Sequence, residues 1–260
     1  MSNFAMSIDL FMTQPVYRVS PSATLPEVSE VIRRHRVSSM LVVDNASQPV
    51  GVVSRTDLLR QGRDSAGGRP EAKLLSLPHK AVSEVMTSPV TTVAMGTSVR
   101  EAATLMVERH QHRVYVVNDG GEAQGVFSTK DVMTAVAGEK VKAPISRWMS
   151  SPIFTVRSDE PIALATERLE KAHVTGIVVV ENGWPVGVFT QRESLLSADL
   201  ERSTPVEEAM SPSLLCMHLE TPTHRAAAQA AATTVRRVIA TDGREMKGIL
   251  TGLDFARAVL

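Results

Sequence analysis

The sequence predicts an α/β fold made of four copies of one small strand-helix-strand-strand-helix unit. Three observations predict it. Four segments place a proline two or three residues after a methionine. Each is followed by a β-prone stretch and then by apolar residues at helical spacing. Four later strands each begin with a glycine. The methionine–proline segments are Met12–Pro15, Met86–Pro89, Met149–Pro152 and Met210–Pro212, and the glycines are Gly51, Gly125, Gly187 and Gly248.

The elements of each copy follow from local patterns. The first strands are expected at residues 16–19, 90–93, 153–156 and 214–217. Helical spacing then begins near Leu25, Val99, Ile162 and Ala226, and the preceding Ser22, Thr97, Ser158 and Thr221 are candidate N-caps. Apolar second strands are expected at residues 40–43, 114–117, 177–180 and 238–240. A turn rich in Asn, Asp and Gly separates each from the glycine-led strand. A short helix ends each copy.

One such unit buries too little apolar surface to be stable alone, so the copies should work in pairs. We expect one pair in residues 1–137, with repeats at about 8–60 and 82–136, and a second in residues 138–260, with repeats at about 145–198 and 206–260. Residues 137–144 and 197–205 read as connectors. Residues 61–80 are rich in Gly, Arg, Pro and Ser and read as an exposed insertion or loop.

Composition bounds the class of protein. Lys plus Arg and Asp plus Glu both number 28, giving a formal net charge of +0, so neither nucleic acid nor membrane is an expected partner. No long apolar run or signal peptide is visible, and a cytoplasmic location is expected. Met6 is a second candidate for the natural start. The lone Cys216 lies between Leu215 and Met217 and is expected to pack in the core.

Sequence motifs of catalysis are missing from this chain. It has no nucleophile elbow, no P-loop and no dinucleotide glycine fingerprint. The histidines show no metal-ligand spacing with carboxylates or with Cys216. We therefore predict a protein that is not an enzyme and has no metal site.

Four seven-residue segments carry the strongest signal, and we call them the signature segments. Each reads glycine, an apolar residue, any residue, Ser or Thr, two further residues and an acid. With the methionine–proline segments, this pattern resembles the CBS domain family over nearly the whole chain. The resemblance implies two tandem Bateman modules. The signature segments are Gly51–Asp57, Gly125–Asp131, Gly187–Glu193 and Gly248–Asp254.

The resemblance also implies a ligand and partners. Family members commonly hold AMP, ADP, ATP, S-adenosylmethionine or a related adenosyl compound between paired repeats. We accordingly expect an adenine nucleotide, accompanied by Mg²⁺ where the ligand is a polyphosphate. An unidentified effector protein and a homodimer are further expectations of the same origin.

The signature segments contain chemistry suited to adenosine. A carboxylate can accept both hydrogen bonds of a ribose diol, which nominates Asp57, Asp131 and Asp254 and, more weakly, the longer Glu193. A hydroxyl at a helix N-terminus can donate to phosphate, which nominates Ser54, Ser128 and Thr251 and, more weakly, Thr190. The same spacing is also a helix capping box, which needs no ligand.

Basic residues supply a second nomination. His112-Arg113 and Arg236-Arg237 stand at matching positions before the second strands of repeats two and four. The segment His112–Val114 is similar to the phosphate-contacting segment of the gamma subunit of AMP-activated protein kinase. Arg55 and Lys130 lie inside signature segments and are also candidates for contacting a phosphate. The alternative is that all of these are solvated charges at strand edges.

Two hypotheses of function follow. In the first, the chain senses an adenosine-containing ligand and transmits its presence through the packing of the modules. In the second, the chain is a ligand-free assembly or scaffold module whose signature segments serve only as helix caps.

Overall fold

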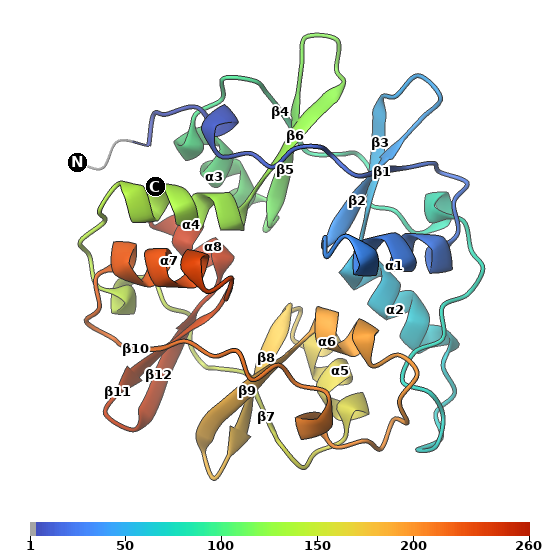
Figure 1. The fold of residues 1–260 in the computed structure, drawn as a ribbon, viewed down its shortest axis with the longest axis vertical. Coiled ribbons are helices and arrows are strands. Elements are labelled where there is room, and N and C mark those ends of the chain that lie inside the picture. The colour runs from blue at the N-terminus through green and yellow to red at the C-terminus, as the bar shows by residue number, and fades with distance from the viewer. Residues whose placement is uncertain (1–3) are drawn as a thin grey trace. The chain divides into compact units, whose positions relative to one another are not determined.

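The computed structural model describes residues 4–260 and shows four repeats of one topology (Figure 1). Residues 1–3, at the start of the first predicted pair, lie outside the described residues. In each repeat a short first strand runs parallel to the second strand, which pairs antiparallel with the third. The predicted α/β fold class is confirmed.

The bounds of the elements repeat closely from unit to unit. Repeat one contains η1 (Ile8–Leu10), β1 (Arg18–Val19), α1 (Leu25–Arg34), β2 (Ser39–Val43), β3 (Pro49–Ser54) and α2 (Arg55–Ser65). Repeat two contains η2 (Val82–Glu84), β4 (Thr92–Ala94), α3 (Val99–Glu108), β5 (Arg113–Val117), β6 (Ala123–Ser128) and α4 (Thr129–Gly138).

The second half of the chain follows the same order. Repeat three contains η3 (Ile145–Arg147), β7 (Thr155–Arg157), α5 (Ile162–Lys171), β8 (Gly176–Glu181), β9 (Trp184–Thr190) and α6 (Gln191–Leu196). Repeat four contains η4 (Val206–Glu208), β10 (Cys216–His218), α7 (Thr223–Ala232), β11 (Val238–Asp242), β12 (Glu245–Leu250) and α8 (Gly252–Arg257).

The predicted N-caps of the first helix in each repeat are wrong. Thr24 and Ser98 occupy the N-cap positions of α1 and α3, with Glu27 and Glu101 completing capping boxes. Pro161 and Pro222 precede α5 and α7 and offer no side-chain cap. Backbone carbonyls of the connectors take over this role: Ile162 N donates to Thr204 O at 2.8 Å and Thr223 N to Ala143 O at 2.8 Å. Connectors thus satisfy donors that sequence reasoning assigned to local side chains.

The described residues divide into two compact units, with one cluster of buried apolar residues in unit 1 and two in unit 2. Unit 1 comprises the chain through Val16, Thr91–Ile153 and Leu214–Leu260, and unit 2 comprises Tyr17–Val90 and Phe154–Ser213. Within unit 1, α4 packs against α7 and α8. Within unit 2, α2 packs against α6. The prediction that repeats pair as residues 1–137 and 138–260 stays a prediction.

The segment 61–80 is only partly the exposed loop that its composition predicts. Helix α2 continues to Ser65, and Leu74 and Leu75 are buried in the core of unit 2. Leu74 N donates to Leu200 O at 2.8 Å and Leu75 N to Ala198 O at 3.1 Å. The longest continuous exposed stretch in this segment is residues 67–71. Burial of the two leucine side chains stabilises this part of the segment.

Cys216 is exposed, so the prediction that it packs in the core is wrong. Side chains alternate along β10, and Leu215 before it takes the buried position instead. Partial burial raises the pKa of the Cys216 thiol, which disfavours the reactive thiolate.

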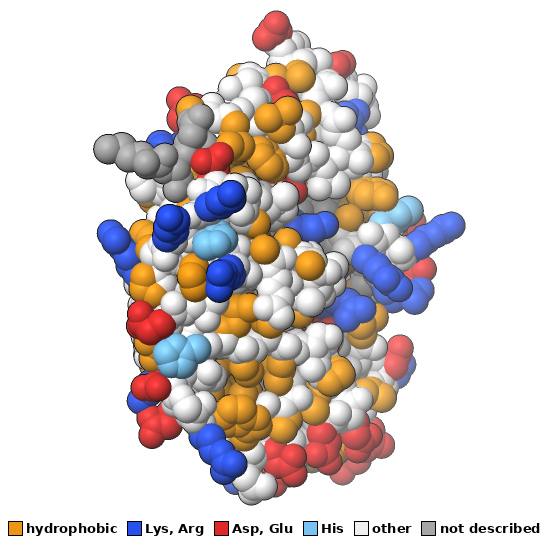
Figure 2. All heavy atoms as spheres, turned by 60° about the vertical axis from the view of Figure 1, so that its left-hand side comes forward, with side chains coloured by type: hydrophobic (Ala, Val, Ile, Leu, Met, Phe, Trp, Pro, Cys, Tyr) orange, Lys and Arg blue, Asp and Glu red, His pale blue; other side chains and the backbone are white. Residues whose placement is uncertain are grey.

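The surface shows no dominant charge on the face drawn in Figure 2. Lys and Arg side chains form small, separate groups among apolar and acidic ones. Among the described residues, no helix combines the length and the apolar character that crossing a bilayer requires.

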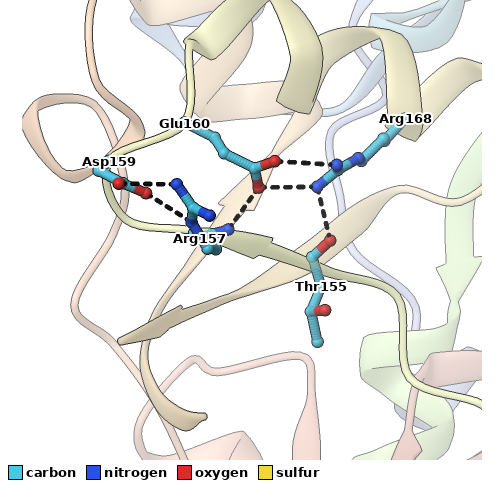
Figure 3. A network of polar contacts seen from close by, with 5 residues as sticks. All are labelled: Thr155, Arg157, Asp159, Glu160 and Arg168. Carbon is cyan, nitrogen blue, oxygen red and sulfur yellow. Dashed lines mark hydrogen bonds and ion pairs between the residues drawn. The ribbon is translucent and has the colours of Figure 1, made fainter. Parts of the chain in front are cut away.

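An arginine network ties α5 to the first strand of repeat three (Figure 3). Arg168 donates to both oxygens of Glu160, at 2.9 and 3.1 Å, and to the carbonyl of Thr155 at 3.1 Å. Glu160 also accepts from the backbone N–H of Arg157 at 2.7 Å. The network therefore fixes the turn between β7 and α5 by charge-assisted hydrogen bonds.

Candidate functional site

Each signature segment joins a third strand to the last helix of its repeat. The Ser or Thr is the N-cap of that helix and the acid is its third residue. In repeat two, Ser128 N and Ser128 Oγ donate to Asp131 Oδ2 at 2.8 and 2.7 Å. Ser54 with Asp57 and Thr251 with Asp254 repeat this arrangement. The structure thus contains the capping role that the sequence left open beside ligand binding.

The four buried carboxylates differ in their second oxygen. Asp131 Oδ1 accepts no hydrogen bond from any other described residue. Asp57 Oδ1 has one distant donor, Arg60 Nη2 at 3.4 Å. A diol needs open acceptor sites, so these two acids are the better placed for ribose.

The other two carboxylates already accept hydrogen bonds on both oxygens. Asp254 Oδ1 accepts from Ser150 Oγ at 2.8 Å and from Arg257 Nη1 at 2.6 Å. Glu193 Oε1 accepts from Arg192 Nη1 at 2.8 Å, and its Oε2 accepts from the Thr190 hydroxyl. Sequence reasoning missed these partners. The acid–x–x–Arg spacing in α8 was a readable signal, whereas nothing local pointed to Ser150.

The glycine of every signature segment lies against a methionine of a methionine–proline segment. A Cβ on Gly51 would overlap Met86 Sδ, and one on Gly125 would overlap Met12 Sδ. On Gly248 it would lie 2.6 Å from Met149 Sδ, and Gly187 meets Met210 in the same way. The close approach that only glycine permits is therefore made by a thioether. Each contact joins two consecutive repeats.

The basic residues of repeats two and four meet in unit 1. Burial, and after it the charges of Arg113, Arg237 and Arg236, lower the pKa of His112 to about 4. Arg113 lies directly across the sheet from Ser128, the N-cap of α4. The structure thus brings together four residues that stand in two separate repeats of the sequence.

Asp131 lies within electrostatic reach of this basic cluster. The side chain of Arg236 is exposed, yet surrounding protein lowers its pKa by desolvation, against which the charge of Asp131 acts. Burial likewise raises the pKa of Asp131, despite hydrogen bonds from Ser128 and the charge of Lys130 that oppose it. Perturbed groups gathered in one place are typical of binding and catalytic sites.

Unit 2 has no equivalent cluster among its described residues. Its signature segments face each other through Gln191 Nε2, which donates to Thr56 Oγ1 at 2.9 Å. Arg55, a candidate for phosphate, donates to Val37 O at 2.7 Å. Lys130, the corresponding candidate in unit 1, is exposed.

A family model described as CBS domain matches residues 7–64, 82–138 and 145–193. The chain belongs to the CBS domain family. Residues 206–260 lie outside these matches but have the element order and sheet topology of the other three repeats.

Two curated proteins match half or more of this chain. An uncharacterized 33.4 kDa protein in a ribosomal RNA operon of Thermofilum pendens is 28% identical over 201 residues, covering 72% of this chain and 63% of that protein. An uncharacterized protein of Methanopyrus kandleri is 26% identical over 129 residues, covering 50% of this chain and 62% of that protein. The chain thus spans less than two thirds of the length of these curated relatives.

Two solved structures resemble the CBS chain over nearly its full length. A Methanocaldococcus jannaschii protein, described as a proposed archaeal homologue of g-AMPK, has a TM-score of 0.83 at 16% identity, with 96% of this chain and 99% of that chain covered. An uncharacterized conserved protein of Pyrococcus horikoshii has a TM-score of 0.70 at 19% identity, with 98% and 100% covered. At these identities the likeness shows the fold alone.

Proposed function

We propose that this CBS protein is a regulatory module that binds an adenosine-containing ligand and catalyses no reaction. AMP, ADP, ATP and related adenosyl compounds such as S-adenosylmethionine are the proposed ligands, with Mg²⁺ accompanying a polyphosphate. The observation that carries the proposal is the basic cluster of unit 1 beside Asp131. Three guanidinium groups act on one desolvated imidazole there. Such a concentration of positive charge is costly until an anion neutralises it.

The residues of unit 1 suit the two ends of a nucleotide. Asp131 would accept the ribose diol through its open oxygen. Arg113, Arg236, Arg237 and His112 would hold the phosphate, and Ser128 lies directly opposite Arg113.

The other predicted residues remain proposals of lower rank. Asp57 keeps a nearly open oxygen, whereas Asp254 and Glu193 would have to give up existing donors. Like one by Ser128, phosphate contacts by Ser54, Thr251 and Thr190 would compete with the hydrogen bonds these residues make to the capping acids. Arg55 would have to leave the carbonyl of Val37.

The reciprocal methionine–glycine contacts support pairing of consecutive repeats into modules 1–137 and 138–260. Met12 of repeat one contacts Gly125 of repeat two, and Met86 of repeat two contacts Gly51 of repeat one. A ligand bound beside a signature segment would act on this contact. Transmission through module packing to an effector protein, within a cytoplasmic homodimer, completes the proposal.

An assembly module without a ligand is the second candidate. The complete capping boxes at Ser54, Ser128 and Thr251 favour it, because they give these segments a structural role that needs no bound molecule. Such a protein would bind a partner or itself through a surface that no nucleotide affects.

A thermal unfolding panel separates the two candidates. The ligands are AMP, ADP, ATP, NAD, S-adenosylmethionine and GTP, each with and without Mg²⁺. A ligand that binds only the folded state stabilises it by about 2.7 kcal/mol at one hundred times its dissociation constant. We expect adenosyl compounds to raise the melting temperature and GTP to leave it unchanged. A flat panel, with no change of solution size on adding nucleotide, would favour the assembly module.

A further inference from the structure

Three of the four repeats pair a residue across the sheet with the capping serine or threonine. Arg113 pairs across the sheet with Ser128 in unit 1. In unit 2 the equivalent pairs are Ser39 with Ser54 and Gly176 with Thr190. The carbonyls of the preceding residues, His112, Ser38 and Thr175, all accept from the first N–H of the following helix. These positions can therefore be compared one to one.

In unit 1, two cations near the signature segment of repeat two remain available. The exposed side chains of Arg236 and Lys130 make no hydrogen bond or ion pair with any other described residue. Asp131 lies within electrostatic reach of both. An incoming phosphate would therefore gain charge contacts here without breaking any made by these two side chains.

In unit 2 the cations near the signature segments are engaged. Arg55 donates to the carbonyl of Val37 at 2.7 Å, and Arg192 donates to Glu193 at 2.8 Å. Arg60 lies 3.4 Å from Asp57, and Arg63 pairs with Glu170. A phosphate would have to break these contacts and approach two buried carboxylates. A ribose diol, by contrast, still finds an acceptor in Asp57 Oδ1.

We infer that the two units divide ligands by charge, with unit 1 binding phosphate-bearing adenosine compounds and unit 2 binding adenosyl compounds that lack a phosphate. This inference rests on the proposed function and names the ligand class of each unit. Arg236 and Arg113 are the residues that set the preference of unit 1, and their replacement by Ser38, Ser39, Thr175 and Gly176 sets that of unit 2.

Isothermal titration of the full chain with AMP, adenosine and S-adenosylmethionine tests the division. Asp131→Asn and Asp57→Asn make the same chemical change at the third residue of the helix that follows the signature serine, one in each unit. Arg236→Gln removes a cation from unit 1, and Arg244→Gln is its control, because Arg244 is an exposed arginine in the turn between β11 and β12.

We expect Asp131→Asn and Arg236→Gln to lower the affinity for AMP by about tenfold or more. This is the effect of losing one hydrogen bond to, or contact with, a charged group. Asp57→Asn and Arg244→Gln should leave AMP affinity unchanged. The affinities for adenosine and S-adenosylmethionine should fall in Asp57→Asn and be unchanged in Arg236→Gln. If an Asp variant fails to fold, competition replaces it: saturating AMP should leave the binding of adenosine to the unaltered protein intact.

The results that would overturn the inference are distinguishable from the one that would remove the proposed function. Equal weakening of AMP by both Asp variants, or displacement of adenosine by AMP, would show that the units are not selective while the proposed function stands. Failure of adenosine and S-adenosylmethionine to bind at Asp57, while AMP binds at Asp131, would equally exclude the assignment of unit 2. Failure of all three ligands to bind the unaltered protein would remove the proposed function itself.

Discussion

At the scale of single residues, partners outside the signature segments decide which acid can bind a ligand. The four segments are nearly interchangeable in sequence, and all four carboxylates are buried. Ser150 and Arg257 nevertheless occupy Asp254, whereas Asp131 keeps an open oxygen. Sequence analysis predicted the four acids but ranked only Glu193 lower, on length. The rank of Asp254 depends on Ser150, more than one hundred residues earlier in the chain, a contact that no local pattern encodes.

The depressed pKa of His112 predicts how stability depends on pH. Unfolding returns His112 from a pKa of about 4 to its ordinary value of 6.5. The unfolded chain therefore binds a proton between these values that the folded chain refuses, so stability falls as pH drops through this window. Between pH 7 and pH 5 the loss from this residue is about 2 kcal/mol. Urea unfolding at both pH values measures it.

The control for this prediction is His112→Asn, which removes the titrating group and keeps a polar side chain. Its stability should fall less than that of the unaltered protein between pH 7 and pH 5. Equal losses in the two proteins would show that His112 titrates normally and is not held neutral by burial and its three arginine neighbours. AMP should reduce the loss in the unaltered protein, because a phosphate favours the protonated imidazole.

At the scale of elements, periodicity predicted where helices lie better than what caps them. Apolar spacing located α1, α3, α5 and α7 because each must bury one face. The caps depended on tertiary contacts. Carbonyls of Thr204 and Ala143 meet the first N–H groups of α5 and α7, so no side-chain cap is needed there. Connector residues thus accept the hydrogen bonds at these helix N-termini, a role that sequence reasoning assigned to Ser158 and Thr221.

The contact between α4 and α8 in unit 1 depends on one glycine. A Cβ on Gly252 would overlap the side chain of Thr129, the first residue of α4. We expect Gly252→Ala to destabilise the protein by about 1–3 kcal/mol, the usual cost of overpacking. Thermal or urea unfolding measures this change.

The matched control is Gly138→Ala, at the end of α4, where an added Cβ meets nothing within 4 Å. Its stability should be unchanged or slightly raised. Adding Thr129→Gly to Gly252→Ala should recover part of the loss by removing the overlapping atoms. A Gly252→Ala variant as stable as the unaltered protein would show that α4 and α8 do not pack this closely.

At the scale of the whole molecule, the repeat architecture was readable and its internal contacts were only partly so. Four methionine–proline segments and four glycine-containing strands predicted four repeats, and the structure contains them. The prediction that these strands open with glycine is wrong, because each begins two or three residues before its glycine. That each methionine packs on such a glycine is a finding of the structure. Composition misjudged residues 72–75, because two leucines among polar neighbours were enough to bury that segment.

The candidate site shows the same limit. Alignment of the second strands of repeats two and four predicted two equivalent basic pairs, His112-Arg113 and Arg236-Arg237. Their gathering beside Asp131 required the fold of unit 1, which brings parts of repeats two and four into one compact body. Charge counted over the whole chain, with a net value of +0, gave no sign of this local concentration.

The central claim is that an adenosine nucleotide binds unit 1 with its ribose on Asp131 and its phosphate on the basic cluster. A crystal structure of the full chain with AMP tests this most directly. We predict a diol hydrogen-bonded to Asp131 Oδ1 and phosphate oxygens within hydrogen-bond distance of Arg113 and Arg236. A nucleotide bound elsewhere, or crystals grown in saturating AMP whose unit 1 holds none, would contradict the account.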